Sequence, residues 1–536
     1  MTMKLRQSTI ALFGTLLWSA HGLAGSLTAG EASLGPLEQD WLFQVRGNPT
    51  SQGVREEIRR ARALTERLGM NSAQSDFSAD LDQLHALEGQ LDDEAEGQAL
   101  VELYLTVRRL KRTITLKNPA IDFSRILLID VPYPGAHHES AHRHGYRTRG
   151  QGRLLILDGL DPGSPVRSLV PEEHAGFLWR PDLSFDADKI VFCLMSAGKR
   201  SFHLHEVNVD GTGFRQLTFG DYDDLDPIFL PDGKLMFTTT RAHTYVRCGP
   251  THQSPVLARC DADGKNIYVI SRNCEPDYLP SLLPDGRIIY TRWEYTDKEQ
   301  KRAQSLWTMN PDGTGVSMFW GNQSVWPDIL AEPRPIPGTE RVMFTGVGHH
   351  MWFQGAIGII DPAKGMNYPD GLTKVTTEIP WPEVGDGPRE KSESPGYRPG
   401  PYASCKTPYP ISEEDFLVSL MHPATKKFSL YLMDLSGNRE LIYTGRHNAW
   451  HAMPLKPRPR PPLIRNRVEW PVIGPDQKPL KHGVLYSANV FEGAPKIPRD
   501  KVKHLRVLQI DPKTYTPWKK TYQHSGPSIS VTQADG

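Results

Sequence analysis

The densest group of potential metal ligands in the sequence is the stretch HHESAHRHGYRT, which begins at His137. Within it, His138, Glu139 and His142 form an HExxH pattern. On an α-helix the two histidines would lie one turn apart on one face and could bind Zn²⁺, while the glutamate would activate the zinc-bound water. The pattern by itself predicts a zinc-dependent hydrolase.

The surrounding residues argue against a helix at this position. Pro132, Pro134 and Gly135 leave little room for the preceding helical turns, and Thr148 occupies the place of the third metzincin ligand. Solvated loop histidines are therefore the preferred interpretation. The alternative is a loop site for zinc, copper or nickel without peptidase activity, because clustered neutral imidazoles bind these metals. Its candidate ligands are His137, His138, His142 and His144.

A second group of candidate ligands is His243, Cys248, Cys260 and Cys274. Cys248 ends one predicted strand and Cys260 lies in the next, so we first expect a disulfide across the hairpin, which requires Cα atoms within ~7 Å. A free Cys248 thiolate that binds a metal is the alternative, because the charge of neighbouring Arg247 would lower the thiol pKa.

A third group lies in the stretch GVGHHMWFQG, where His349 and His350 close a predicted strand beside two aromatic residues. In a propeller, strand ends converge on the central channel, so either histidine could meet the Cys248 loop there. Buried, hydrogen-bonded histidines are the alternative interpretation.

The acidic stretch GDYDDLDP offers oxygen ligands for Ca²⁺ but lacks the EF-hand layout. A hydrogen-bonded turn is the preferred interpretation for its four aspartates, Asp221, Asp223, Asp224 and Asp226.

Several catalytic signatures are absent from the sequence. It contains no CxxCH, no GxSxG and no GxxxxGK[ST]. Covalent attachment of c-type haem within this chain is therefore not supported, and neither a serine-hydrolase nucleophile elbow nor a phosphate-binding loop is present. The chain has 5 cysteines, so at least one thiol is unpaired within it.

The elements that position these residues fall into zones. From about Val54 to Lys117 the sequence is charged and free of proline, with apolar residues three and four apart, which predicts three amphipathic helices. The periodic residues of the first predicted helix are Val54, Ile58, Ala61, Leu64 and Leu68. Asn118-Pro119 ends the helical zone.

After Pro119 the sequence repeats itself. The stretch WRPDLSFDADKIVF recurs as DPIFLPDGKLMFTTTR and as YLPSLLPDGRIIYTRWE, and each copy is followed by a second Asp-Gly or Pro-Asp-Gly turn. Two hairpin turns per period of roughly 50 residues predict the four strands of a propeller blade. Degenerate copies on both sides raise the predicted number of blades to about six.

These repeats resemble the TolB-type periplasmic propeller repeat. The ordered motifs HLHEVNVDGTGFRQLTFGDYDDLDPIFLPDGKLMF, YVRCG, LPDGRIIYTRWEY, RPIPGTERVMFTGVGHH and LYLMDLSGNRELIYTG resemble more narrowly hydrazine synthase alpha-subunit-like proteins, over residues 119–465. The resemblance implies an exported multihaem protein whose later domains carry CxxCH sites, and whose true enzymes condense a nitrogen oxide with ammonia. This chain departs from that pattern because it has no CxxCH.

Composition and the N-terminus indicate the compartment. The 536 residues include 62 Lys plus Arg and 62 Asp plus Glu, so no net field attracts a polyanion, which argues against a nucleic-acid binder. Lys4 and Arg6 precede about ten apolar residues and then small residues, the pattern of a secretory signal. We expect a periplasmic or secreted protein with no membrane span beyond that signal.

The sequence thus predicts a mainly β protein with four regions. They are a signal peptide (1–25), a short α-helical segment (26–118), a TolB-like β-propeller of about six blades (119–452), and a Pro-rich exit followed by a partial β-rich C-terminal domain (453–536).

We prefer a propeller that binds a protein partner or acts in a larger assembly and is not an enzyme by itself. The first alternative is a metal- or haem-associated redox component related to hydrazine synthase, with zinc or copper as the candidate metal. A zinc hydrolase using the HESAH motif is the second. The candidate metal ligands are His138, His142, His144, Cys248, His349 and His350.

Overall fold

The computed structural model describes most of the helical and repeat zones. The described residues are 34–71, 76–92, 96–133, 150–199, 201–247, 253–295, 303–324, 326–349, 355–381, 400–468, 491, 498–504 and 506. The predicted signal peptide, the HESAH motif, Cys248, His350 and most of the predicted C-terminal domain lie outside these residues, so those predictions remain predictions.

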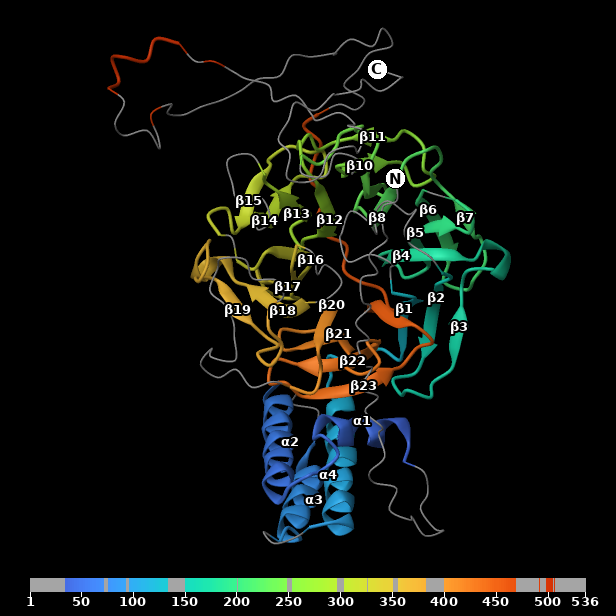
Figure 1. The fold of residues 1–536 in the computed structure, drawn as a ribbon, viewed down its shortest axis with the longest axis vertical. Helices are drawn as coiled ribbons and strands as arrows, with labels where there is room; N and C mark the ends of the chain where they lie inside the picture. The colour runs from blue at the N-terminus through green and yellow to red at the C-terminus, as the bar shows by residue number, and fades with distance from the viewer. Residues whose placement is uncertain are drawn as a thin grey trace, which may run out of the picture.

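The helical zone forms a small bundle below the propeller in Figure 1. The apolar positions predicted from the three-and-four spacing of the first helix are buried, and they pack against the third predicted helix in one core. The bundle has one helix more than the sequence predicted, a nine-residue helix that begins at Pro36 and is too short to show a periodic pattern. The helices are α1 (Pro36–Gln44), α2 (Ser51–Asn71), α3 (Ser78–Gly89) and α4 (Gln98–Leu116).

The repeat zone is a β-propeller of six four-stranded antiparallel blades. The first strand of each blade contacts the first strand of the next, so these strands surround the central channel. From the inside outward, blade 1 is β24 (Asn448–Pro454), β1 (Arg125–Val131), β2 (Arg153–Asp158), β3 (Val166–Ser168), and blade 2 is β4 (Gly176–Leu183), β5 (Lys189–Ser196), β6 (His203–Asn208), β7 (Arg215–Gln216).

The other four blades follow in chain order, and single-residue bridges link blades 4, 5 and 6 into one continuous sheet. Blade 3 is β8 (Asp224–Phe229), β9 (Leu235–Thr239), β10 (Val256–Cys260), β11 (Tyr268–Val269), and blade 4 is β12 (Asp277–Leu282), β13 (Ile288–Trp293), β14 (Gln304–Met309), β15 (Ser317–Trp320). Blade 5 is β16 (Ile329–Pro335), β17 (Val342–Val347), β18 (Gly355–Ile360), β19 (Leu372–Lys374), and blade 6 is β20 (Ser404–Pro410), β21 (Asp415–Met421), β22 (Phe428–Asp434), β23 (Arg439–Tyr443).

The two turns of the repeat lie where the sequence placed them. In blades 3 and 4 the Pro-Asp-Gly turn joins the first two strands, and the second Asp-Gly turn joins the last two. Gly233 and Gly286 take the left-handed conformation in the first of these turns, with φ of +81° and +89°. Glycine adopts that conformation without a steric penalty, which explains its place in the repeat.

The last strand of the propeller was not foreseen. β24, which overlaps the predicted Pro-rich exit, pairs antiparallel with β1 and forms the inner strand of blade 1. Trp450 on this strand packs against Trp179 of blade 2, with ring centroids 5.6 Å apart. Residues from the two ends of the propeller therefore complete one blade together.

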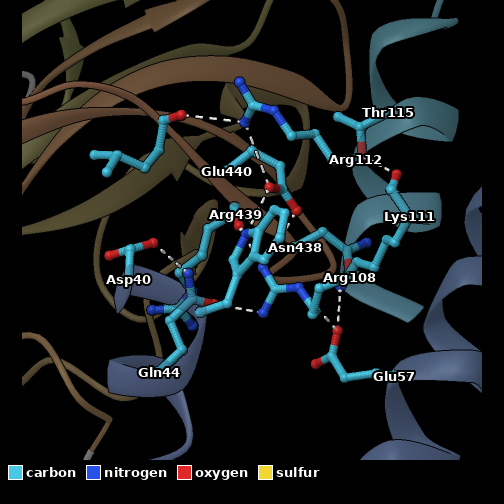
Figure 2. A network of polar contacts seen from close by, with 12 residues as sticks. Asp40, Gln44, Glu57, Arg108, Lys111, Arg112, Thr115, Asn438, Arg439 and Glu440 are labelled. Atoms are coloured by element: carbon cyan, nitrogen blue, oxygen red, sulfur yellow. Dashed lines mark hydrogen bonds and ion pairs between the residues drawn. The ribbon is translucent and has the colours of Figure 1, made fainter. Parts of the chain in front are cut away.

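The helical bundle is attached to the outer strand of blade 6 by buried charges (Figure 2). Glu440 on β23 accepts hydrogen bonds from Trp41 Nε1 at 3.0 Å and from Arg108 Nη2 at 3.2 Å. Arg112 Nη1 lies 3.5 Å from the same carboxylate. These contacts fix the helices against the propeller edge, away from the central channel.

Candidate binding site at the mouth of the channel

Each inner strand carries one β-bulge, and the bulge holds a residue other than glycine at positive φ. Bulges bend a strand and redirect a side chain, and a positive φ outside glycine is strained. In five of the six blades a proline follows this residue. The six bulge residues are Arg180, Asp226, Leu279, Glu332, Thr407 and His451, with φ between 34° and 55°.

The bulge residues are buried, and hydrogen bonds link several of the blades at this level. Glu332 of blade 5 accepts hydrogen bonds from Lys406 Nζ at 2.6 Å and from the backbone N–H of Thr407 at 3.0 Å, both in blade 6. The backbone N–H of His451 in blade 1 donates to Thr407 Oγ1 at 3.2 Å, and Arg180 of blade 2 donates to the carbonyl of Pro280 in blade 4 at 2.8 Å. We call the six bulges together the bulge layer.

Burial and neighbouring charges shift the pKa values of side chains in the bulge layer. Burial lowers the pKa of Arg180 to about 10, and the nearby Asp226 carboxylate opposes that shift. Burial and the charges of Lys406 and Arg180 hold the pKa of His451 well below its usual range. His451 is therefore neutral at physiological pH, and its ring packs edge-on against Trp179 at 5.1 Å.

The Pro-rich exit segment, residues 455–462, runs from blade 1 across the face of the propeller where the inner strands end. Arg458 donates to Asp182 Oδ2 at 2.8 Å in blade 2, and its own backbone N–H donates to the carbonyl of Phe185 at 2.9 Å. The guanidinium carbons of Arg458 and Arg460 each lie 5.0 Å from the centre of the Phe185 ring. Pro462 then reaches Gly286 in blade 4.

A cleft of about 360 Å³ remains between this segment and blades 2 to 6. Seven of the eighteen lining residues are prolines, and the aromatic residues are Phe185 and Tyr409. Proline walls are stiff, so the cleft is formed before any ligand arrives. The prolines are Pro284, Pro335, Pro337, Pro410, Pro459, Pro461 and Pro462.

The cleft is cationic as well as apolar. Its charged lining residues are three arginines, Arg334, Arg458 and Arg460, and one carboxylate, Asp182. Arg334 on β16 lies over the Tyr409 ring, with its guanidinium carbon 5.6 Å from the ring centre. Burial lowers the pKa of Arg334, and the attraction of Asp182 opposes that shift.

Of the six candidate metal ligands, only His349 lies within the described residues. It is buried at the end of β17, with Nδ1 3.2 Å from Gln304 Nε2 and its ring 5.3 Å from the Trp293 ring. Gln304 in turn accepts from Tyr278 Oη at 2.5 Å. The alternative of a buried, hydrogen-bonded histidine therefore describes His349. His138, His142, His144, Cys248 and His350 remain untested candidates.

The expected disulfide across the hairpin is not formed, because Cys260 is a free thiol. Its side chain is buried in a hydrophobic core to which all six blades contribute, and burial raises the pKa of the thiol to about 12. A buried thiol of this kind is inert toward oxidation and metals. The strand position was predicted correctly, but the side chain faces the core.

The acidic stretch is divided among separate partners. Asp224 pairs with Arg241 at 2.7 Å, Asp223 accepts from the backbone N–H of Phe202 at 2.9 Å, and Asp226 is the bulge residue of blade 3. The hydrogen-bonded turn is thus the better description. Within the described ranges, no three His, Cys, Asp or Glu side chains gather closely enough to hold a metal ion.

The cleft and the bulge layer were missed at the level of sequence, although a signal was present. The signal is a bulge residue followed by proline, which recurs at one place in the repeat, just before each first turn. The five copies are Arg180-Pro181, Asp226-Pro227, Leu279-Pro280, Glu332-Pro333 and Thr407-Pro408. When the repeats are aligned on these pairs, Trp450-His451 takes the place of Trp179-Arg180. This match indicates the inner strand β24, which the sequence analysis did not predict.

Comparisons with known proteins support the architecture. No family model matches the sequence, and no curated protein matches it. The chain is similar to hydrazine synthase from Kuenenia stuttgartiensis, with a TM-score of 0.51 and 16% identity, over 63% of this chain and 48% of that chain. TolB from Acinetobacter baumannii gives a TM-score of 0.40 and 13% identity, over 67% of this chain and 73% of that one.

These likenesses concern the fold alone. The chain spans about half the length of the hydrazine synthase chain that it matches. It is a mainly β propeller with N-terminal helices, distantly related in fold to hydrazine synthase. Among the helices that the structure describes, none is long and apolar enough to cross a membrane.

Proposed function

We propose that this chain is an exported β-propeller whose channel-mouth cleft binds a segment of a partner protein within a larger assembly. The observation that carries the proposal is the preformed cleft, which the exit segment and the ends of five blades build together. Its volume of about 360 Å³ is in the range of sites that enclose a few side chains.

The stiffness of the cleft supports binding. Arg458 and Arg460 anchor the exit segment to Asp182 and Asp186 of blade 2, at 2.8 and 3.1 Å. An anchored, proline-rich wall loses little conformational entropy when a ligand binds, so more of the contact energy appears as affinity. Loops and strand ends on a rigid scaffold are also where binding sites are commonly found.

The helical bundle leaves this face free. Its polar contacts among the described residues go to blade 6, through Glu440, Asp415 and Asp434, and to the outer turn of blade 1, through Asp161, and none of these residues lines the cleft. The bundle can therefore contact one component of an assembly while the channel mouth contacts another.

The proposed assembly is one of the hydrazine synthase alpha-like type. The support is the ordered set of motifs over residues 119–465 together with the shared propeller fold. The predicted secretory signal supports export, and fractionation of the host cell would test it.

Site-specific photocrosslinking tests the binding role. A benzoylphenylalanine placed at Pro337, on the exposed rim of the cleft, is expected to crosslink one defined partner in the exported fraction. The control places the same group at Val166, which is 40% exposed on the outer strand of blade 1. The adduct should be absent from the control and should disappear when Tyr409→Ala is added. Equal adducts from both positions would contradict the proposal.

A further inference from the structure

We infer that Arg334 is the anion-binding residue of the cleft, and that the bound segment places a carboxylate against its guanidinium and an apolar side chain against the proline wall. This inference rests on the proposed function, because it names the chemistry of the ligand at the same site. The occupant is thus the C-terminal segment of a partner protein that ends in an apolar residue.

The charges around the channel leave Arg334 as the available cation. Lys406 Nζ is held by Glu332 at 2.6 Å, and Arg458 Nη2 is held by Asp182 at 2.8 Å. Its backbone pairs with Met343 in the sheet, but no hydrogen bond or ion pair joins the Arg334 guanidinium to another side chain or carbonyl in the part of the chain that the structure describes. Its contact with the Tyr409 ring is a cation–π contact and uses no N–H hydrogen bond of the guanidinium.

The carboxylates near Arg334 form hydrogen bonds with other groups. Glu332 accepts from Lys406, Thr345 and the backbone of Thr407. Asp182 Oδ2 accepts from Arg458 and from the backbone N–H of Phe229, while Asp182 Oδ1 is buried without a hydrogen-bond partner among the described residues and attracts Arg334 only through its charge. With three arginines and one aspartate among its lining residues, the cleft has a formal charge of +2 (3 − 1), which complements an anion.

The geometry of Arg334 suits a carboxylate in particular. A guanidinium offers N–H groups in a planar fork that matches the two oxygens of a carboxylate, and stacking on an aromatic ring fixes that plane. In a half-buried cleft such a charge-assisted pair is stronger than at an open surface. An ammonium group at this position would lack the fork.

The apolar lining of the cleft determines which group should lie next to the carboxylate of the ligand. Ile228, Leu282 and Leu283 line the cleft together with the prolines. A flat apolar or aromatic group adjacent to the carboxylate would cover this wall while its acid reached Arg334. A carboxylate and an apolar side chain lie that close together in a peptide that ends in an apolar residue.

The test uses two small probes that differ only in charge, N-acetyl-L-phenylalanine and N-acetyl-L-phenylalaninamide. Binding to the full chain is measured by ligand-observed NMR titration. The acid is expected to bind about tenfold more tightly than the amide, as one charge-assisted hydrogen-bond pair predicts. In the Arg334→Gln variant the affinity for the acid should fall to the affinity for the amide. The Arg334→Lys variant should keep part of the preference for the acid.

Arg287→Gln is the matched control, because Arg287 lies on the same face in the first turn of blade 4 and does not line the cleft. It should leave the preference for the acid unchanged. Equal binding of the two probes, a preference that survives Arg334→Gln, or no binding of either probe would overturn the inference. If the Pro337 crosslink persists in that case, only the anion assignment fails; if the crosslink is lost as well, the binding role also fails.

Discussion

Arg108 on α4 and Glu440 on β23 form an ion pair with 3.2 Å between Nη2 and Oε1, although 332 positions separate them in the sequence. Both side chains are 1% exposed. A second guanidinium, that of Arg112, shares the same carboxylate (Figure 2). Removing the charge of Glu440 would leave the buried Arg108 without its nearest counter-ion, while Arg112 would keep Asp161 at 2.9 Å.

We therefore expect Glu440→Gln to lower the free energy of unfolding by about 3–5 kcal/mol. Urea denaturation followed by circular dichroism measures the change. Glu413→Gln is the control, since Glu413 pairs with Arg341 while its side chain is 60% exposed. The control should cost under about 1 kcal/mol. Similar losses in the two variants would refute the structural role of the buried pair.

The acid stability of the protein should depend on Glu57. Burial opposes ionisation of this carboxyl, but the charges of Lys111 and Arg108 hold its pKa at about 2, below the ordinary 4.5. A carboxyl with a lowered folded-state pKa contributes stability that is full above pH 4.5 and is lost as the pH falls toward 2. Glu57→Gln should therefore reduce stability at pH 7 and flatten the loss between pH 4.5 and 2.

The neighbouring Glu56 provides a control for screening. Hydrogen bonds from Arg59 are the largest cause that lowers its pKa to about 2, but its side chain is 39% exposed. Salt should remove the effect of Glu56→Gln, because exposed pairs are screened, and should leave most of the effect of Glu57→Gln. At about 0.5 M salt the Debye length is only ~4 Å, so interactions between exposed charges are screened. If the effect of Glu57→Gln on stability vanished under these conditions, burial would not be its cause.

Two glycines in equivalent turns separate conformational strain from contact with the exit segment. Gly233 and Gly286 have φ of +81° and +89°, but a Cβ at Gly233 would meet nothing within 4 Å. A Cβ at Gly286 would lie 2.4 Å from the carbonyl oxygen of Pro462. Both alanine variants should lose about 1 kcal/mol from backbone strain, and Gly286→Ala should also displace the exit segment.

Limited proteolysis measures that displacement. Cleavage after Arg465 or Arg467 by trypsin should be faster in Gly286→Ala than in Gly233→Ala, because a displaced segment loses its anchoring contacts, whereas Arg458 and Arg460 precede proline and resist trypsin. Equal cleavage rates would mean that the contact between Pro462 and blade 4 does not hold the segment in place.

Closure of the ring should depend on Trp450. Its side chain is fully buried and packs against Trp179 of blade 2 and Phe428 of blade 6, with centroid distances of 5.6 and 5.5 Å. Trp450→Ala is expected to lower the free energy of unfolding by about 3–5 kcal/mol, the usual cost of deleting a buried aromatic ring. Trp307→Ala, at a half-buried position of blade 4, should cost clearly less. Thermal unfolding compares the two, and equal losses would contradict the role of Trp450 in closure.

Metal and haem analysis separates the alternatives that the sequence left open. We expect protein purified from the exported fraction to carry neither stoichiometric metal nor haem, measured by elemental analysis and an absorption spectrum. Zinc or copper at one equivalent that disappears in His142→Ala or Cys248→Ala would contradict this and favour the metal-dependent alternatives.

Much of the architecture was predictable because its causes are local. The spacing of Val54, Ile58 and Leu64 predicts a buried helix face, and all three are buried. The Pro-Asp-Gly and Asp-Gly turns predict two hairpins per repeat, because only a few turn types join adjacent strands. A repeat of four strands cannot bury both faces alone, so six repeats predict a ring.

The remaining features depend on residues that are distant in the sequence. Nothing around Cys260 in the sequence distinguishes a thiol that faces a disulfide partner from one that faces the core, since that choice follows from how the blades pack against one another. Glu440 resembles an ordinary strand residue until the helices dock against it. The cleft exists only because the exit segment passes over blades 2 to 4 and brings Arg458 to Asp182, 276 positions earlier in the chain.

The sequence by itself therefore determined the three longer helices, the turns of the repeat and a propeller of about six blades, since these follow from periodicity and turn chemistry over a few residues. The tertiary structure alone decided the inner strand of blade 1, the bulge layer and the cleft that exposes Arg334. The physical reason is that burial and charge pairing act through space, and the residues that carry them come together only when the ring closes.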